Sequence, residues 1–480
     1  MSDKFVAARL VLCVLLTLTV GCRGKQAAFD PASRFTDPGP ERVRELGVYS
    51  GDKRVGDLTF AARDGKWDQT VPARELSEAV TLRLSFRGDR FEMASVGRSW
   101  VDGELGLLGS VAQIDFGAGG WETRAIRTGP GTFQREQITG GSRSREKVTI
   151  PEKAVLTDVL PLFLNRNPGE VGKERSMGVH NLTLGQDLPF TSVYHGQTPM
   201  GRSFTVRYWG MEERLWLDDD GMVTREEMAL GVVAREPGDG EVEGALPLEQ
   251  ILSRTAVPGT GIPDDLGARS KAEITLEGSF RKFPDTRWQT VKMGDGSATV
   301  TLESPRVPPP GARVSQQGES PADTFGLDLD SSRIRELAAE VTKGVQDPWE
   351  KALAVGRWVY GNLGKSMREC FSALTVLEAG EGECQSHSLL TVALCRASGV
   401  PARFAYGVVY LPDRDAFLFH TWVEVHVGEW IPIDPTLGNF PAGVDHLTLA
   451  VGGYRDQLRL FPFIMGKGGW RISMPEARDD

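Results

Sequence analysis

The N-terminal half of the chain alternates hydrophobic with polar side chains, which is the pattern of half-buried β-strands. Residues 80–86 and 204–208 show it most clearly, with an apolar side chain at every second position. The Asp-Gly pair at 220–221 lies between two strand-like runs and predicts a hairpin turn. One interval with helical spacing of apolar residues stands out at about 152–164. We therefore predict a mostly antiparallel β region over residues 46–306, arranged as one domain or as two subdomains.

The pattern changes after a proline-rich segment at residues 307–323, whose composition predicts a linker. Apolar residues then recur at helical spacing over residues 334–341. A second helix is expected to begin at the Asp-Pro pair 347–348, because aspartate caps a helix N-terminus and proline fits its first turn. The chain is thus predicted to be an α+β protein in which a domain of residues 324–480 follows the β region and the linker.

The N-terminus has the layout of an export signal. Two basic residues precede an apolar run over residues 10–20 that is too short to cross a bilayer as a helix. The run ends in Leu-Thr-Val-Gly-Cys at 18–22, which resembles the lipobox of bacterial lipoprotein signals. We predict that residues 1–21 are a signal peptide, that Cys22 is lipidated after cleavage, and that residues 22–45 form a polar tether.

A lipid on Cys22 would anchor the protein to a bacterial membrane in the cell envelope. The residue after Cys22 is Arg23 and not an aspartate. If the cell is Gram-negative, lipoprotein sorting then favours the outer membrane, with the protein facing the periplasm. An ordinary cleaved signal with a chance cysteine at this place is the alternative. No later stretch has the apolar length of a membrane helix.

Length, charge and cysteine content narrow the class of protein. At roughly 100–200 residues per domain, a chain of 480 residues has room for about three domains. Its net charge of −10 argues against nucleic acid as a partner, because binding to nucleic acid needs a basic face. Five cysteines are too few for a disulfide scaffold, and they lie unevenly, at 13, 22, 370, 384 and 395.

Three C-terminal segments contain residue types that form a nucleophilic site. Cys384 opens an apolar run that predicts a buried helix, and the positive end of the helix dipole is expected to lower the pKa of its thiol. His420 lies in an alternating strand, and Asp434 ends the next strand-like run. A thiol, an imidazole and a carboxylate are the parts of a nucleophile, a general base and the group that orients the base.

At these residues the sequence resembles the transglutaminase-like superfamily, which has a papain-like fold. The matching motifs are Gly382-Glu383-Cys384, the segment 396–403, His420-Thr421-Trp422-Val423-Glu424 and Asp434-Pro435-Thr436. The resemblance covers about residues 325–455 and implies that Cys384 is the nucleophile, His420 the base and Asp434 the residue that orients His420. One departure is Ser386, since bacterial relatives often carry an acidic residue two places after the cysteine.

Strand parity gives a geometric condition for this triad. Side chains of a strand alternate between its faces, so His420, Trp422 and Glu424 share one face. A two-residue hairpin turn between the two strands would place Asp434 on the opposite face. The triad therefore requires a three-residue connection or a bulge, with Gly428 in the left-handed conformation.

The predicted activity is acyl transfer from the amide bonds of a protein or peptide, peptidoglycan peptides included, through a thioester on Cys384. Resolution by water would make the protein a peptidase or amidase, and resolution by an amine a transglutaminase. Both remain open, and no cofactor or metal is implied. The alternative from another class is a non-catalytic binding or assembly lipoprotein that uses the domain as a recognition module.

Other interpretations of the same residues stay open at this level. Cys384 could be a buried structural thiol, or could join Cys370 and His387 in a zinc site. Three further residues are candidates for contacting the catalytic side chains and holding them in place: His387, Trp422 and Glu424. Trp422 could instead simply pack in the core, and Glu424 could be a solvated carboxylate. A disulfide between Cys370 and Cys395 is also conceivable in an oxidising compartment.

Overall fold

The computed structural model describes residues 29–474 of the chain apart from short stretches at 87–88, 116–119, 140–141, 152, 183–185, 209–210, 229–230, 239–240, 248–255, 279–281, 307–323, 367, 369, 461–462 and 464–469. The predicted signal peptide, Cys22, the start of the tether and the 307–323 linker lie outside the described residues. The chain divides near residue 248 into two compact units, which are treated separately below. In the described part of the chain, none of the helices combines the length and the apolar content needed to cross a membrane.

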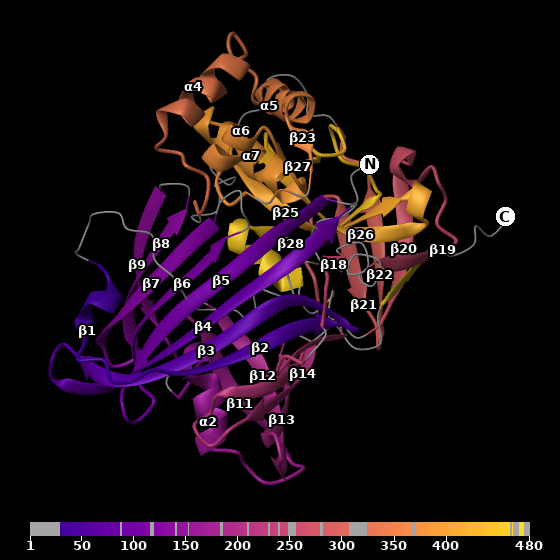
Figure 1. The fold of residues 1–480 in the computed structure, drawn as a ribbon. Helices are drawn as coiled ribbons and strands as arrows, with labels where there is room; N and C mark the ends of the chain where they lie inside the picture. The colour runs from indigo at the N-terminus through magenta and orange to yellow at the C-terminus, as the bar shows by residue number, and fades with distance from the viewer. Residues whose placement is uncertain are drawn as a thin grey trace. The chain divides into compact units, whose positions relative to one another are not determined.

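The N-terminal unit is built on one mostly antiparallel sheet, in which the short strands β10, β17 and β18 pair in parallel with β11, β3 and β4. Its strands follow two meanders, from β2 to β9 and from β11 to β16, and pairing of β16 with β2 joins them into a continuous curved layer (Figure 1). The strands are β1 (Phe35–Thr36), β2 (Arg42–Ser50), β3 (Lys53–Trp67), β4 (Val71–Phe86), β5 (Asp89–Val101), β6 (Leu107–Asp115), β7 (Gly120–Gly129), β8 (Thr132–Thr139), β9 (Ser142–Thr149), β10 (Val155–Leu156), β11 (Glu174–Asn181), β12 (Gln186–Thr198), β13 (Gly201–Tyr208), β14 (Met211–Leu217), β15 (Val223–Glu227), β16 (Val232–Arg235), β17 (Val242–Glu243) and β18 (Leu246–Pro247).

The alternating pattern predicted these strands correctly where it was clearest. Residues 80–86 lie in β4 and residues 204–208 in β13. The Asp-Gly pair at 220–221 lies in the turn between β14 and β15, with Gly221 in the left-handed conformation at φ 80°. The helical interval is shorter than predicted, because it holds only the 3₁₀ turn η2 (Thr157–Val159) and α2 (Leu160–Arg166).

The short helix α2 and its preceding turn pack on the β4–β8 part of the sheet. Leu162 lies in a buried cluster with Val101 and Phe133, and the Ser99 hydroxyl donates to the buried carboxylate of Asp158 over 3.0 Å. The unit therefore has its core between the sheet and this segment. A further 3₁₀ turn, η1 (Pro31–Arg34), precedes β1.

The C-terminal unit joins helices to a nine-stranded sheet with the order β21-β22-β20-β29-β19-β26-β25-β28, in which β27 also pairs with β26. The elements are β19 (Val257–Thr260), β20 (Lys271–Glu277), β21 (Gln289–Met293), β22 (Ser297–Glu303), α4 (Ser332–Val341), α5 (Pro348–Asn362), β23 (Gly364–Lys365), α6 (Ala373–Ala379), β24 (Glu381–Gly382), α7 (Cys384–Ala397), β25 (Ala402–Leu411), β26 (Ala416–His426), β27 (Trp430–Ile433), β28 (His446–Gly452) and β29 (Arg471–Ser473), with 3₁₀ turns η4 (Leu266–Ala268), η5 (Pro412–Arg414) and η6 (Tyr454–Leu460).

The division between the units differs from the predicted domain boundary at residue 306. Strand β20 pairs with β29, and β19 pairs with both β26 and β29, so residues 257–303 belong to the C-terminal unit. The proline-rich segment 307–323 thus connects parts of one unit. The proline-rich composition marks the place where the strand pattern changes to a helical one. Which segments share a core is decided by strand pairing between residues far apart in the sequence, as in β19 and β20.

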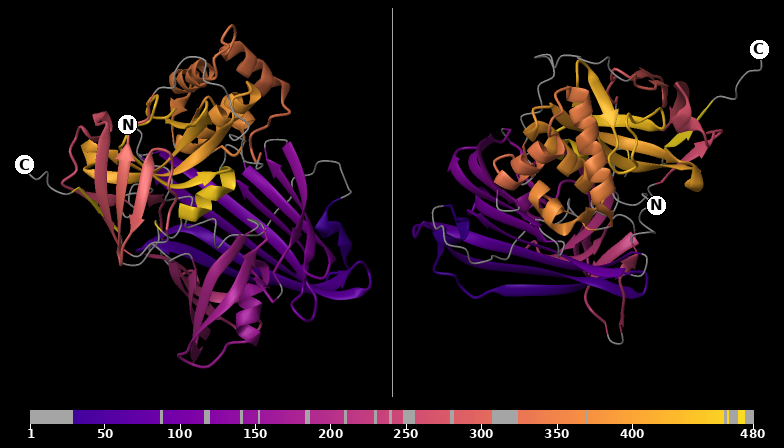
Figure 2. Two further views of the ribbon diagram at one scale, coloured as in Figure 1. Left: turned by 180° about the vertical axis from the view of Figure 1, so that it is seen from behind. Right: turned by 90° about the horizontal axis from the view of Figure 1, so that it is seen from above.

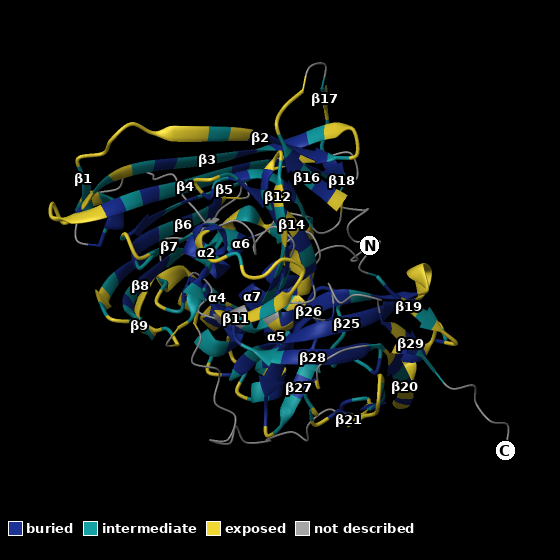
Figure 3. Cartoon of the chain, turned by 90° about the horizontal axis from the view of Figure 1, so that it is seen from below, coloured by how far each residue is buried: buried dark blue, intermediate teal, exposed yellow. Residues whose placement is uncertain are grey.

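The helices of the C-terminal unit confirm the sequence-based boundaries closely. The Asp347 carboxylate accepts from the N–H groups of Trp349 and Glu350 at the start of α5, as the Asp-Pro pair predicted. Helices α4 to α7 lie together in the right view of Figure 2, and α7 packs against β25 and β26. Strands β25 and β26 are buried along nearly their whole length (Figure 3). Strands account for 52% and helices for 19% of the structure, so α+β describes it only loosely.

Candidate active site

Helix α7 begins at Cys384, and the preceding residue supplies its cap. The Glu383 carboxylate accepts from the Gln385 N–H at 2.8 Å and from the Ser386 N–H at 2.9 Å, which satisfies two amides that a helix start leaves without acceptors. The Ser386 hydroxyl also donates to this carboxylate at 3.0 Å. The Ser386 side chain therefore helps to hold the Glu383 carboxylate in place at the start of the helix.

The environment of the Cys384 thiol differs from the predicted one. Cys384 is 1% exposed, and its Sγ lies 3.7 Å from a Glu383 carboxylate oxygen. Burial, and after it the negative charge of Glu383, raises the pKa of the thiol well above its usual range, although the backbone of Thr421 acts to lower it. The expected lowering of the pKa is wrong, because the helix dipole acts against both burial and an adjacent carboxylate. Both effects favour the thiol over the thiolate.

The hairpin between β26 and β27 meets the geometric condition for the triad. His426 pairs with Trp430, so the connection has three residues, as the triad required. The Val427 N–H donates to the Glu429 carbonyl over 3.0 Å, and Gly428 adopts the left-handed conformation at φ 99°. This register brings the side chains of Asp434 and His420 to the same face of the sheet.

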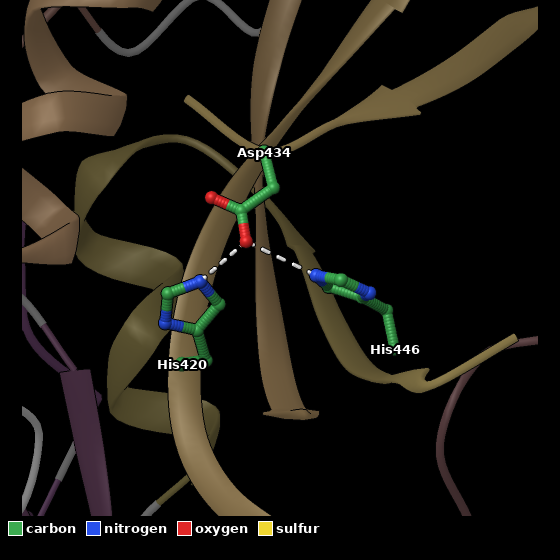
Figure 4. Close-up of side chains that lie close together, drawn as sticks. All are labelled: His420, Asp434 and His446. Carbon is green, nitrogen blue, oxygen red and sulfur yellow. Dashed lines mark hydrogen bonds and ion pairs between the residues drawn. The ribbon is translucent and has the colours of Figure 1, made fainter. Parts of the chain in front are cut away.

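Asp434 lies between two histidines. One of its carboxylate oxygens, Oδ2, is 2.8 Å from His420 Nε2 and 3.1 Å from His446 Nε2 (Figure 4). The other oxygen accepts from the N–H groups of Thr436 and Leu437. Burial would raise the pKa of Asp434, but the two histidines hold it well below its usual range. The carboxylate is thus ionised and fixed from four sides, and the second nitrogen of His420 points away from it.

His446 is the functional candidate that the sequence reasoning missed. It opens β28, which pairs with β25 rather than with the strand of His420, so only the sheet order brings it to Asp434. Its Nδ1 lies 2.9 Å from Asp445 Oδ1. Burial opposes its charge, yet Asp445 and Asp434 together raise the pKa of His446 to about 10. The adjacent Asp-His pair was a sequence signal, although nothing in its spacing connected it with His420.

Residues 335–435 match the family model of the transglutaminase-like superfamily. The chain contains a transglutaminase-like domain. The matched residues include Cys384, His420 and Asp434 and end before His446. An uncharacterised protein of Mycobacterium leprae is 26% identical over 149 residues, which are 29% of this chain and 52% of that protein. The chain thus spans about half the length of this curated relative.

Two solved structures are similar at a low level. A candidate cysteine protease from Cytophaga hutchinsonii is 19% identical with a TM-score of 0.28, and the match covers 42% of this chain and 80% of that one. A β-barrel-like protein of unknown function from Brucella abortus is 9% identical with a TM-score of 0.30, covering 41% of this chain and 94% of that one. Because both TM-scores are low, the assignment of the transglutaminase-like domain rests on the sequence match.

The three supporting candidates lie in different settings within the transglutaminase-like domain. Trp422 is fully buried, stacked on His420 at 6.1 Å and edge-on to His446 at 5.1 Å, so it packs against both imidazoles. Glu424 is not a solvated carboxylate: it is 2% exposed and accepts from Arg403 at 2.7 Å. Burial raises its pKa, and the arginine partly offsets that effect. His387 is buried in the first turn of α7, with Nδ1 2.9 Å from the Glu383 carbonyl oxygen.

His420, Asp434 and His446 each offer one atom that can bind a metal ion. These nitrogen and oxygen atoms lie within 4.8 Å of one another, and two imidazoles with a carboxylate are a set that divalent transition metals use. Both Nε2 atoms face the same Asp434 oxygen at hydrogen-bond distance, however, and a metal would have to replace both contacts. Of the described residues, the zinc set Cys370, Cys384 and His387 is not brought together as a metal-binding group.

The remaining described cysteines of the transglutaminase-like domain, Cys370 and Cys395, are buried. Neither Cys370 nor Cys395 forms a disulfide. Burial raises the pKa of Cys395 to about 12. These thiols lie in the same unit as Cys384, so they serve as internal references for its reactivity.

Proposed function

We propose that the protein is a thiol enzyme that transfers acyl groups from amide bonds, with Cys384 as nucleophile, His420 as base and Asp434 as the residue that orients the base. The observation that carries this proposal is the buried contact of His420 with Asp434 at 2.8 Å, on a strand, β26, against which the helix that begins at Cys384 packs. An imidazole fixed through Nε2 by an ionised carboxylate leaves Nδ1 to handle the proton of a neighbouring thiol.

In the proposed reaction, Nδ1 of His420 takes the proton of Cys384 as the sulfur attacks the carbonyl carbon of the substrate amide. Cys384 is the first residue of α7, so its own N–H has no acceptor within the helix and can donate to the oxyanion. The imidazolium gives its proton to the leaving amine, and a thioester remains on the sulfur. Water or a second amine then attacks the thioester, with His420 again acting as the base.

The raised thiol pKa gives His420 a specific task. A resting thiolate would need an environment that stabilises its charge, whereas burial and Glu383 disfavour it here. Deprotonation is therefore coupled to attack on the substrate. Asp434 stabilises the imidazolium that forms, and its own ionised state is maintained by the protonated His446.

We propose further that the protein acts in the cell envelope, on protein or peptide substrates that include peptidoglycan peptides. The support is the signal-like segment before Cys22 and the lipobox-like residues around it. Expression in a bacterium with an alkyne-labelled fatty acid tests the anchor: label should enter the wild-type chain and be lost in Cys22→Ala. Equal labelling of both chains would refute it.

An activated ester tests the proposed chemistry without knowledge of the natural substrate. With p-nitrophenyl acetate, the wild-type protein should release p-nitrophenolate in a burst close to one equivalent, followed by slower turnover. Cys384→Ala should abolish the burst, whereas Cys395→Ala should leave it unchanged. Added primary amine should accelerate the slow phase if the enzyme is a transferase and leave it unaffected if it is a hydrolase. A wild-type protein without a burst would favour the recognition module instead.

A further inference from the structure

The N-terminal unit contains a cavity of about 150 Å³ that the proposed thiol chemistry does not use. Side chains of β3, β4 and β12 to β15, together with the η2–α2 segment, form its walls. Most of the lining is apolar, with Phe60, Leu76, Leu162, Phe190, Val206 and Leu215 among the contributors. A cavity of this size can hold a molecule of about the size of benzene.

Two glutamates, Glu78 and Glu226, are among the charged groups in this mostly apolar wall. Glu226 of β15 is 5% exposed, and among the described residues it has no hydrogen-bond or ion-pair partner. Its neighbour in register on β14 is Leu215, which also lines the cavity. Glu78 of β4 also lines the cavity, and the negative charges of Glu78 and Glu226 repel each other. Both therefore lie in the cavity without a compensating cation.

The other charged groups around the cavity are already engaged. Arg42 pairs with Asp220 at 2.7 Å, and Arg74 pairs with Asp64 at 2.8 Å. Of the other acids, Glu213 accepts from the Tyr208 hydroxyl and Asp158 accepts from Ser99. Glu226 and Glu78 are thus acid groups of the lining that have no hydrogen-bond or ion-pair partner among the described residues.

We propose that this cavity binds an organic ammonium ion whose apolar body is about the size of a benzene ring. A carboxyl group in an apolar wall, buried as Glu226 is or half-buried as Glu78 is, is stabilised by a cation that reaches it, and the apolar lining favours a hydrophobic body on that cation. A neutral ligand of the same shape would satisfy the lining but leave the two acids unpaired. A bare divalent metal ion would instead find too few oxygen ligands among these side chains.

The protonation state of the acids provides a second observable. Burial raises the pKa of Glu226 to about 7, and burial together with Glu226 raises the pKa of Glu78 well above its usual range. The titratable and charged groups facing them from the surrounding elements are Arg42, Arg74, Asp158, Tyr208, Glu213 and Asp220. An ammonium ligand favours the ionised carboxylates, so its binding releases protons and strengthens as the pH rises from 6 to 8.

Calorimetry on the full chain with benzylamine and its neutral counterpart benzyl alcohol tests the proposal. At pH 8 benzylamine should bind about tenfold or more tightly than benzyl alcohol. Glu226→Gln combined with Glu78→Gln should remove that preference while leaving the affinity for the alcohol unchanged. Glu45→Gln, which changes an exposed glutamate on β2 of the same sheet, is the matched control and should behave as wild type.

Equal affinity for the two ligands, binding of neither, or an unchanged preference in the double variant would overturn the proposal. Titrations of the wild-type chain in two buffers of different ionisation enthalpy give an independent reading that needs no variant. Release of protons with benzylamine, and not with benzyl alcohol, is the expected result. Amine binding without proton release at pH 6 to 7 would show that the ligand does not pair with these acids.

Discussion

The two units bury acid groups in opposite ways. In the C-terminal unit Asp434 is fully buried and its pKa lies well below the usual range, because two histidines and two amides face it. In the N-terminal unit Glu226 is almost as buried, but nothing in the described chain pairs with it, and burial raises its pKa to about 7. Partners, rather than burial, decide the charge of a buried carboxyl group.

This difference separates two kinds of site. A carboxylate whose partners are supplied by the chain itself stays charged and can orient a catalytic base, as we propose for Asp434. A buried acid group without partners is uncharged over part of the physiological pH range. It can form an ion pair with a bound cation, as we propose for Glu226. Substitutions in each unit test whether the contrast has these consequences.

The largest effect is expected at Asp434. Asp434→Asn removes the charge that both histidines face and disturbs the ring orientation of His420, so the acylation rate should fall by about 10³- to 10⁴-fold. The rate of the p-nitrophenol burst measures it. Glu424→Gln is the comparison variant, because it removes another buried carboxylate on the same sheet whose partner is Arg403. Similar losses in both variants would mean that the effect reflects folding rather than the base.

Glu226→Gln should stabilise the N-terminal unit in a pH-dependent manner. The folded pKa of Glu226 is about 7, above the unfolded value of 4.5, so the wild-type chain has the full stabilising contribution of the protonated group below about pH 4.5 and loses it as the pH rises through 7. Relative to wild type, the variant should gain about 3 kcal/mol at pH 8 or above and nothing at pH 4.

Hydrogen exchange of the β4 and β15 amides at pH 4 and pH 8 measures this gain within the N-terminal unit. Glu45→Gln should show no such gain at either pH. A gain of the same size at both pH values would mean that Glu226 is not the group that titrates.

His446→Gln should slow acylation by about tenfold, since the variant keeps a side chain that can bond Asp434 but loses the positive charge. In the wild-type protein, ¹⁵N NMR should find both ring nitrogens of His446 protonated at pH 8, because its pKa is raised to about 10. A folded pKa above the unfolded 6.5 means that this charge stabilises the fold below pH 6.5 and is lost as the pH rises through 10.

The same spectrum distinguishes positioning from metal binding. A metal bound by His420, Asp434 and His446 would remove the proton from His446 Nε2, and chelation would then restore it. An unchanged spectrum and an unchanged burst after chelator treatment are expected for the ion-paired arrangement. Loss of the burst on chelation would contradict the role given to His446.

A change of about the same size as that in His446→Gln, but toward a faster reaction, is expected at the helix cap. Glu383→Gln removes the carboxylate beside Cys384 while keeping an oxygen that can cap α7, so the thiol pKa should fall and alkylation by iodoacetamide at pH 7 should accelerate by about tenfold. Peptide mass spectrometry measures the rate at Cys384. Glu381→Gln, two residues earlier and paired with Arg368 on the surface, should leave that rate unchanged.

Local signals predicted the parts of the site that depend on neighbouring residues. The start of α7 at Cys384 and the three-residue connection through Gly428 follow from capping and strand parity, which act over a few residues. His446 and the membership of residues 257–303 depend on the order of strands in the sheet, which no local pattern contains. The direction of the thiol pKa shift was wrong because Glu383 and the burial of the helix start outweigh the dipole.

The most direct test of the central claim is the rate at which p-nitrophenyl acetate acetylates each cysteine, followed by acid quench and peptide mass spectrometry. We expect rapid acetylation of Cys384 to about one equivalent, with Cys370 and Cys395 unmodified on the same timescale. In His420→Ala the rate at Cys384 should fall to that of Cys395. Acetylation of Cys384 no faster than that of Cys395 in the wild-type protein, or a rate that is indifferent to the loss of His420, would contradict it.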